Sequence, residues 1–413
     1  MRHGLRAATL VAALLGVCVA GCGGPRQAQG PARITLWTQM DPEERARFEE
    51  NLDAFRAAHP GVEIEYVPYD TENLRQQFQT AAAAGGGPQI IFGPSDQVGP
   101  LSLIGVIRPL DEVMPAGFFD RFVPQALDTL GGHLWAAPDQ VGNHLTLVYN
   151  RALVPEPPET WDEFMALARR LTRPAGGGQP ARYGFAMNVM EPYWLVPFLA
   201  GYGGWVMDAD RNPTLDTPAM RQALALLADL KNRSGVMPRE SDYQVAETLF
   251  KEGQAAMIVN GPWSWSAYRK AGIDVGVAPI PRLPNGAWAA PMTASKGYSI
   301  NANVPDAELP RVVELVEFLT SAEAQRRRAV ELGTLPSHAD AYADSAIAND
   351  PTLQASRRAF ALGRRMPVVP EMRVLWDVMR PGLQQVMAGA RTPEEAAREM
   401  QAQAVQQIAG MRR

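Results

Sequence analysis

RITLW at residues 33–37 is followed by DPEE at 41–44, VEIEY at 62–66 and QIIF at 89–92, and these four segments together indicate the fold class. The first, third and last of these segments are short and apolar or alternating, which predicts β-strands. Between the strands, apolar residues recur at helical spacing: Phe48, Leu52, Phe55, Leu74 and Phe78. Asp41 before Pro42 and two glutamates is typical of a helix N-terminus. This strand–helix alternation indicates a doubly wound α/β fold, whose ligands bind beyond the carboxyl ends of the strands.

The rest of the chain continues this alternation and then turns mostly helical after about residue 305. Further strands are expected at residues 145–149 and 255–259, and further helices are expected to begin at Thr160, Thr217 and Pro262. Thr392 before Pro393 and two glutamates predicts the start of the last helix. The pattern therefore predicts two α/β lobes with a helical C-terminal portion packed onto them.

Composition limits the class of protein. A length of 413 residues corresponds to roughly two to three domains. A hydrophobic fraction of 46% with 20% charged residues argues against long disorder and against a polytopic membrane protein. The formal net charge of −5 makes nucleic acid an unsuitable partner. The only cysteines are Cys18 and Cys22, so no disulfide or thiolate metal site is expected beyond them.

The N-terminus reads as an export signal. Residues 1–6 contain two arginines, and the 14 apolar residues that follow at 7–20 are too few to span a bilayer. The sequence Val19-Ala20-Gly21-Cys22 resembles the lipobox at which bacterial lipoproteins are cleaved and acylated. We therefore expect a signal peptide at 1–21, lipidation of Cys22, a tether at 22–31, and a body held in the periplasm or on the outer side of the cytoplasmic membrane. An ordinary secretory peptide with an incidental cysteine is the alternative.

Common signatures of catalysis are missing from the sequence. It contains no GxxxxGK[ST], GxSxG or HExxH motif and no GxGxxG after a strand. The histidines beyond residue 21 are few and widely spaced. No catalytic residue, metal site or cofactor is therefore predicted.

Aromatic residues instead stand beside acidic or polar residues at three turns: EPYW at 191–194, GPWSW at 261–265, and PE at 370–371 leading to LWD at 375–377. A pyranose has an apolar C–H face and a rim of hydroxyl groups, so a sugar site needs a flat ring with polar partners around it. The same rings near helix starts are also typical of core anchors, and Asp41 and Asp96 also fit as helix caps. The local pattern alone leaves both roles open.

Taken in order, several segments together resemble the extracellular solute-binding proteins of bacterial ABC sugar importers, and the maltose/maltodextrin-binding branch in particular. The similarity runs from Ile34 to the last helix. Its most specific parts are GPQIIF at 87–92, LVYN at 147–150, PETWDEF at 158–164, EPY at 191–193, NGPWSW at 260–265, and MPVVPEM at 366–372 followed by Trp376.

The resemblance implies a periplasmic-binding-protein type II fold, in which two discontinuous α/β lobes surround a ligand cleft and move about a hinge. The N-terminal lobe would comprise residues 32–141 and 297–345, and the C-terminal lobe residues 146–292 and 350–413. The implied function is binding of a sugar, of the maltose/maltodextrin type or a related oligosaccharide, for delivery to an ABC permease. A monomer without enzymatic activity is expected.

Site residues follow from the same resemblance. The stacking rings would be Tyr193, Trp263 and Trp376, and the acids that bind sugar hydroxyls would be Glu191 of one lobe with Asp41 and Asp96 of the other. Trp265 matches a structural tryptophan. The chain departs from the branch at four positions, which leaves the length and linkage of the sugar open: Gly93 replaces a tryptophan, Gln97 an arginine, Asn143 a glutamate and Asp377 a tyrosine. Asn143 and Gln97 are included as altered hydrogen-bonding partners.

Two other functions stay open at this point. Acids around a sugar could serve a glycoside hydrolase, which needs two carboxylates about 5–9.5 Å apart across the scissile bond. A similarly built cleft could also bind a different solute, such as a polyamine or a peptide.

Overall fold

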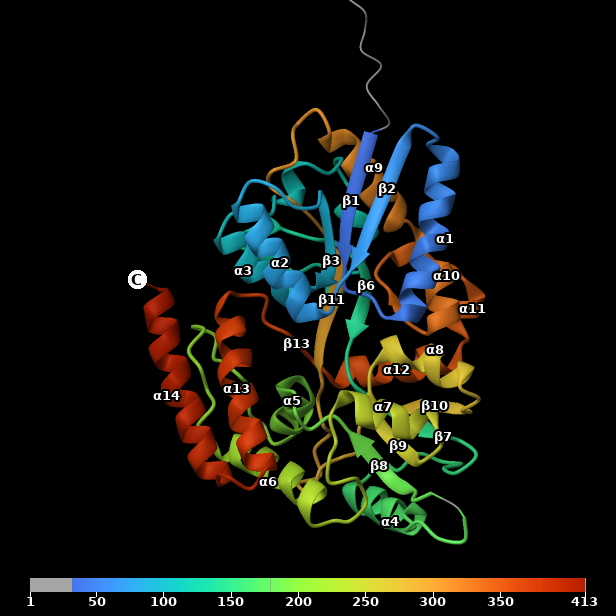
Figure 1. Cartoon of the computed structure of the whole chain (residues 1–413), viewed down its shortest axis with the longest axis vertical. Helices are drawn as coiled ribbons and strands as arrows, with labels where there is room; N and C mark the ends of the chain where they lie inside the picture. The colour runs from blue at the N-terminus through green and yellow to red at the C-terminus, as the bar shows by residue number, and fades with distance from the viewer. Residues whose placement is uncertain (1–31, 179, 413) are drawn as a thin grey trace, which may run out of the picture.

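The computed structural model describes residues 32–178 and 180–412, which form two α/β lobes stacked along the long axis of the molecule (Figure 1). The expected signal peptide at 1–21, Cys22 and the tether at 22–31 lie outside the described residues. Within the described part of the chain, no helix combines the length and the apolar character that crossing a bilayer requires.

The N-terminal lobe is built on a seven-stranded sheet with the strand order β12-β6-β11-β3-β1-β2, and β13 pairs with β11 at its side. Strand β1 runs parallel to β2 and β3, whereas β11 runs antiparallel to β3 and β6. The strands are β1 (Ala32–Thr38), β2 (Val62–Pro68), β3 (Ile90–Pro94), β6 (Ala137–Asn143), β11 (Met292–Ile300), β12 (Leu335–Pro336) and β13 (Arg364–Arg365). The helices of this lobe are α1 (Pro42–Ala58), α2 (Thr71–Ala83), α3 (Val98–Leu103), α9 (Leu309–Leu319), α10 (Ala322–Leu332) and α11 (Ser345–Ala348).

The C-terminal lobe has a four-stranded sheet with the order β10-β7-β9-β8. Its strands are β7 (Thr146–Asn150), β8 (Tyr183–Met187), β9 (Ala255–Asn260) and β10 (Val275–Ala278). Its helices are α4 (Trp161–Leu171), α5 (Pro192–Gly201), α6 (Pro218–Asn232), α7 (Tyr243–Lys251) and α8 (Pro262–Lys270), followed late in the chain by α12 (Pro351–Leu362), α13 (Glu371–Met387) and α14 (Pro393–Met411). A separate hairpin joins β4 (Thr129–Leu130) to β5 (His133–Leu134).

The chain passes repeatedly between the lobes. The first passage lies between β6 and β7, and β11 makes another, because Met292 packs in the core of the C-terminal lobe while Ile300 packs in the core of the N-terminal lobe. The two discontinuous lobes agree with the predicted fold class. The lobe boundaries themselves stay predictions.

The expected helix starts are confirmed in detail. Asp41, Thr160 and Thr392 each cap a helix in a capping box, where the side chain of the cap and a glutamate three residues later satisfy free backbone N–H groups. The apolar face expected for the first helix is also present, since Phe48, Leu52 and Phe55 are buried against the sheet. Local chemistry thus sets where these helices begin, and the first of them begins at Asp41, beside the site described next.

Candidate functional site

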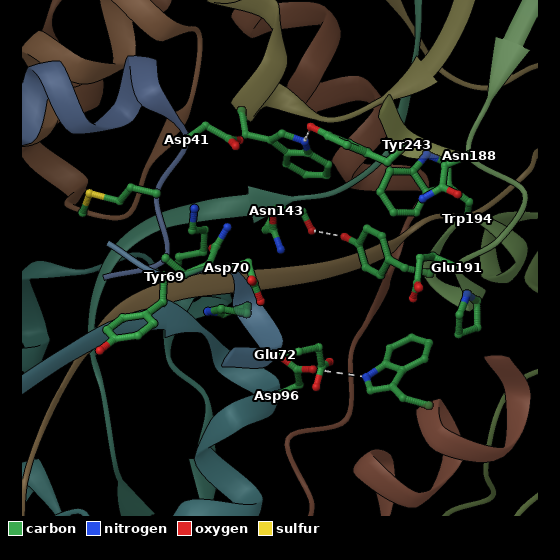
Figure 2. Close-up of a pocket in the computed structure, with 18 of the residues that line it drawn as sticks. Asp41, Tyr69, Asp70, Glu72, Asp96, Asn143, Asn188, Glu191, Trp194 and Tyr243 are labelled. Carbon is green, nitrogen blue, oxygen red and sulfur yellow. Dashed lines mark hydrogen bonds between the residues drawn. The ribbon is translucent and has the colours of Figure 1, made fainter. Parts of the chain in front are cut away.

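A cavity of about 820 Å³ lies between the two lobes. This volume is within the range of about 300–1,000 Å³ that is usual for small-molecule sites. Figure 2 shows Asp41, Asp70 and Asp96 on one side of the cavity and Tyr243, Trp194 and Glu191 on the other. The two walls therefore differ in chemistry, with carboxylates from one lobe opposite aromatic rings from the other.

The acidic wall comes from the strand ends of the N-terminal lobe. Asp41 follows β1, Asp70 follows β2 and Asp96 follows β3, and all three line the cavity. Since β1 is the parallel neighbour of both other strands, the three carboxyl ends lie at one edge of the sheet. Parallel α/β sheets place their ligand sites at this edge.

The aromatic wall comes from helix starts in the C-terminal lobe and from α13. Its rings are Tyr193, Trp194, Tyr243, Trp263 and Trp376. Trp194 makes edge contacts with Tyr193, Tyr243 and Trp263 at centroid distances of 5.7, 5.8 and 6.4 Å. These edge-to-face contacts hold each ring in a fixed orientation.

Trp263 is positioned by its own hydrogen bond and by a glycine. Its Nε1 donates to the hydroxyl of Tyr243 over 3.1 Å. A Cβ atom at Gly261 would come within 2.0 Å of the indole ring, so the ring lies where only glycine leaves room for it. The chain turns from β9 into α8 at this point, and the turn presents the ring to the cavity.

Two hydrogen bonds join the walls around the cavity. Trp376 Nε1 donates to Asp96 Oδ2 over 3.1 Å, which connects α13 to the strand end after β3 (Figure 2). The Tyr193 hydroxyl donates to the backbone oxygen of Asn143 over 2.6 Å, at the passage between β6 and β7. Burial and the nearby charge of Asp96 raise the pKa of Tyr193 well above its ordinary value, so this hydroxyl stays a neutral donor.

Glu191 is the N-cap residue of α5, but its carboxylate does not accept a hydrogen bond from the helix backbone and binds an arginine instead. Arg380 Nε donates to Glu191 Oε1 over 2.9 Å and to Oε2 over 3.0 Å. The carboxylate faces the cavity while the guanidinium on α13 holds it in place. The Glu191 carboxylate is thus oriented before any ligand meets it.

A buried ion pair lies behind Asp41. Lys296 Nζ is 3.1 and 3.0 Å from the two carboxylate oxygens of Glu44, and Gln140 donates to the same carboxylate over 3.2 Å. Burial alone would raise the pKa of Glu44, but the charge and hydrogen bond of Lys296 outweigh burial and lower it. Asp41 has the opposite balance, because burial and the negative charge of Glu44 raise its pKa to about 7.

Seven of the eight residues expected at the site line this one cavity: Asp41, Asp96, Asn143, Glu191, Tyr193, Trp263 and Trp376. Gln97 does not line this cavity, because it is buried behind the cavity wall and borders two much smaller pockets instead. Its side chain folds back over the adjacent strand end, where a Cβ atom at Gly93 would come within 2.8 Å of Gln97 Oε1. The 3-10 turn at Ser95–Gln97 directs Asp96 to the cavity and Gln97 away from it.

Several cavity residues were not anticipated from the sequence: Tyr69, Asp70, Glu72, Asn188, Tyr243, Lys296 and Arg380. Asp70 could have been predicted from the sequence, because it follows the strand β2 just as Asp41 follows β1. Asn188 follows β8 in the same way, next to the parallel strand β9 that leads to Trp263. Lys296 and Arg380 had no comparable local signal.

Within residues 32–178 and 180–412, no group of three or more histidine, cysteine, aspartate and glutamate side chains is arranged to hold a metal ion. The polar groups of the cavity are hydrogen-bonding carboxylates, amides and hydroxyls, together with the cations of Arg45, Lys296 and Arg380. Rings and fixed acceptors of this kind suit a neutral, hydroxyl-rich molecule.

Comparisons with known proteins agree with this arrangement. A family model for bacterial extracellular solute-binding proteins matches residues 50–355. The structure of a maltose/maltodextrin-binding domain from Bdellovibrio bacteriovorus bound to maltotriose is 38% identical, with a TM-score of 0.89, and the match covers 92% of this chain and 100% of that one.

Two curated relatives extend the comparison. A maltotriose-binding protein of Pyrococcus abyssi is 27% identical over 87% of this chain and 78% of its own length. A maltooligosaccharide ABC transporter solute-binding lipoprotein of Streptococcus pneumoniae is 23% identical over 95–96% of this chain and 93–94% of its own length in two strains. With the two lobes, the shared cavity and the matched family model, the chain belongs to the bacterial extracellular solute-binding protein family.

Proposed function

We propose that this protein binds a maltose/maltodextrin-type oligosaccharide outside the cytoplasmic membrane and delivers it to the permease of an ABC importer. The observation that carries the proposal is the pairing of walls, with Asp41, Asp70 and Asp96 of one lobe facing the rings of the other across a single cavity. Rings stack on the apolar faces of the sugar and carboxylates accept its hydroxyl protons. The relatives named above supply the sugar class.

The proposed mechanism is closure about the hinge. A sugar that stacks on the aromatic wall gains its bonds to the acidic wall only when the lobes are together, so the ligand stabilises the closed form through contacts that exist only there. Micromolar affinity requires about −8 kcal/mol, which two or three stacked rings and several charge-assisted hydrogen bonds can supply.

Isothermal calorimetry with maltotriose, a polyamine and a short peptide tests the assignment. We expect heat of binding with maltotriose and none with the other two. Binding of the amine or the peptide without binding of any sugar would replace this function by that of a receptor for another solute.

The proposal excludes sugar hydrolysis. Both carboxylate oxygens of Glu191 accept hydrogen bonds from Arg380, so neither oxygen is free to deliver a proton to a leaving group. Incubation with maltotriose is expected to leave the number of reducing ends unchanged. New reducing ends would show that the protein is a glycoside hydrolase.

The proposal also includes the location of the protein. A monomer lipidated at Cys22 would be held near its permease by the tether at 22–31. Metabolic labelling with a radioactive fatty acid is expected to mark the protein and to fail with Cys22→Ala.

Sugar affinity is expected to increase with pH. Burial and the charge of Glu44 raise the pKa of Asp41 to about 7, and burial raises that of Asp96 to about 6 although the Trp376 hydrogen bond opposes it. Ionised carboxylates are the stronger acceptors for hydroxyl groups, so binding favours loss of these protons. We expect maltotriose affinity to rise about three- to tenfold between about pH 5 and pH 8.

The stability of the unliganded protein should change in the opposite direction. The folded pKa values of both acids lie above the ordinary value of 3.8, so between about pH 4 and pH 7 the folded state binds more protons than the unfolded state. Their contribution to the free energy of unfolding therefore falls as pH rises through this window.

Asp41→Asn tests the pH dependence of sugar affinity. This variant should lose the part of the affinity increase that occurs near pH 7, and an affinity of the unchanged protein that does not vary with pH would contradict the role given to these acids.

A further inference from the structure

A chain of alternating charges crosses from one lobe to the other beside the cavity. Glu72, in the first turn of α2, receives two hydrogen bonds from Arg373 Nη1 on α13, over 2.8 and 2.6 Å. Arg373 also donates to Asp377 over 3.0 and 2.6 Å. Arg380, one turn beyond Asp377, holds Glu191 and lies 3.8 Å from Glu72.

The position of Glu72 makes this network sensitive to lobe closure. Helix α2 belongs to the N-terminal lobe and α13 packs in the core of the C-terminal lobe, so any opening of the hinge separates Glu72 from both arginines. The contact region is closely packed, because a Cβ atom at Gly99 of α3 would lie 2.4 Å from the backbone oxygen of Val368, just before α13. Closure therefore brings α2 and α3 directly against the start of α13.

A second ion pair connects the lobes on the opposite side of the molecule in Figure 1. Glu43, in the first turn of α1, contacts Lys270 at the end of α8. In both places an acid at a helix start of the N-terminal lobe meets a base of the C-terminal lobe.

We propose that Glu72 is a positioning residue of the binding site, which on closure joins Arg373 and Arg380 in an ionic latch and keeps Glu191 oriented toward the ligand. The inference rests on the sugar-binding function proposed above. The latch also gives Asp377, beside Trp376 on α13, a role, because Asp377 binds the Arg373 guanidinium that Glu72 contacts.

The charges of the latch are in the required state at neutral pH. Burial alone would raise the pKa of Glu72, but the hydrogen bond and charge of Arg373 outweigh it and lower the pKa. For Arg373, burial would lower the pKa, yet Glu72 and Asp377 raise it. The Glu72 side chain is still 48% exposed, so dissolved salt can screen the pair.

This exposure yields an unusual expectation, namely that affinity for an uncharged sugar depends on ionic strength. A neutral ligand has no net charge for salt to screen, whereas the latch weakens as the Debye length falls. We expect the Kd of the unchanged protein for maltotriose to rise about three- to tenfold between about 0.05 M and 0.5 M NaCl.

Glu72→Gln tests the latch, with Glu65→Gln as its matched control. The Glu65 side chain is also 48% exposed and also pairs with an arginine, but its partner Arg33 lies in the same lobe. At low salt we expect Glu72→Gln to raise the Kd for maltotriose about three- to thirtyfold, mainly through faster dissociation, and to reduce the salt dependence. Glu65→Gln should match the unchanged protein in both measurements.

Arg373→Gln and the double variant complete the test. If Glu72 acts through Arg373, Arg373→Gln should raise the Kd for maltotriose by a similar factor. The double variant Glu72→Gln/Arg373→Gln should then have a Kd only slightly higher than that of either single variant. A Glu72→Gln protein with unchanged Kd and salt dependence would overturn the latch while leaving sugar binding intact. Failure of the unchanged protein to bind any sugar would instead overturn the proposed function, and the latch with it.

Discussion

Trp263→Ala should weaken maltotriose binding by about 30- to 1,000-fold, which corresponds to about 2–4 kcal/mol. The indole lines the cavity, is oriented by its bond to Tyr243, and lies close over Gly261. Removal of the ring deletes the largest flat surface that this helix start offers to a sugar, and the remaining side chains cannot replace it. Calorimetry at neutral pH measures the loss directly.

The same helix provides a control two residues away. Trp265 is fully buried, packed with Tyr268 and Phe250 in a core cluster of its own. Trp265→Ala should therefore lower the free energy of unfolding by about 3–5 kcal/mol through the cavity it leaves. Trp263→Ala should change stability much less. If Trp263→Ala lost stability as Trp265→Ala does but bound sugar normally, the indole would be a core anchor and the aromatic wall would lose its role.

Lys296→Met is expected to lower the free energy of unfolding by about 3–5 kcal/mol. Lys296 and Glu44 are each 4% exposed at the side chain, and Lys296 is the cation that compensates the buried Glu44 carboxylate at the start of α1. The substitution keeps the volume of the side chain but leaves a buried negative charge beside Asp41. Urea denaturation, followed by tryptophan fluorescence, measures the change.

The double variant Glu44→Gln/Lys296→Met separates the charge from the packing. Glutamine can still receive the N–H of Asp41 in the capping box, and no uncompensated charge remains. We expect the double variant to recover most of the lost stability. A double variant as unstable as Lys296→Met would show that Lys296 acts through packing and not through its charge.

The resemblance to the family assigned Asp41 and Asp96 to the site, because the local pattern fitted helix caps equally well. Asp41 follows β1 and Asp96 follows β3, two strands that run parallel to each other, and the exits from neighbouring parallel strands lie together. The same rule applied to Asp70 would have found it, because the strand before it was also predicted. Lys296 was out of reach, since it lies within β11 and meets Glu44 only through the fold.

The placement of Gln97 outside the cavity and the different positions of the two tryptophans have a common explanation. Side chains one or two positions apart in a turn or helix point in different directions. Their spacing therefore shows that the two side chains differ in direction, but it does not show which one faces the ligand. Asp96 faces the cavity and Gln97 does not, and Trp263 faces it while Trp265 is buried. For the tryptophans, resemblance to the family had assigned a stacking role to Trp263 and a structural role to Trp265.

The helix starts, the strand exits, the alternation of α and β elements and the chemistry of the residues available to a ligand could all be predicted from the sequence, because these features depend on neighbours along the chain. Only the tertiary structure decided which charges meet across the cavity. Glu72 and Arg373 are 301 positions apart, and no spacing rule relates residues on separate lobes. Their contact depends on how two independently built sheets are placed by the β6–β7 passage and β11, which is a property of the packed whole and not of any segment.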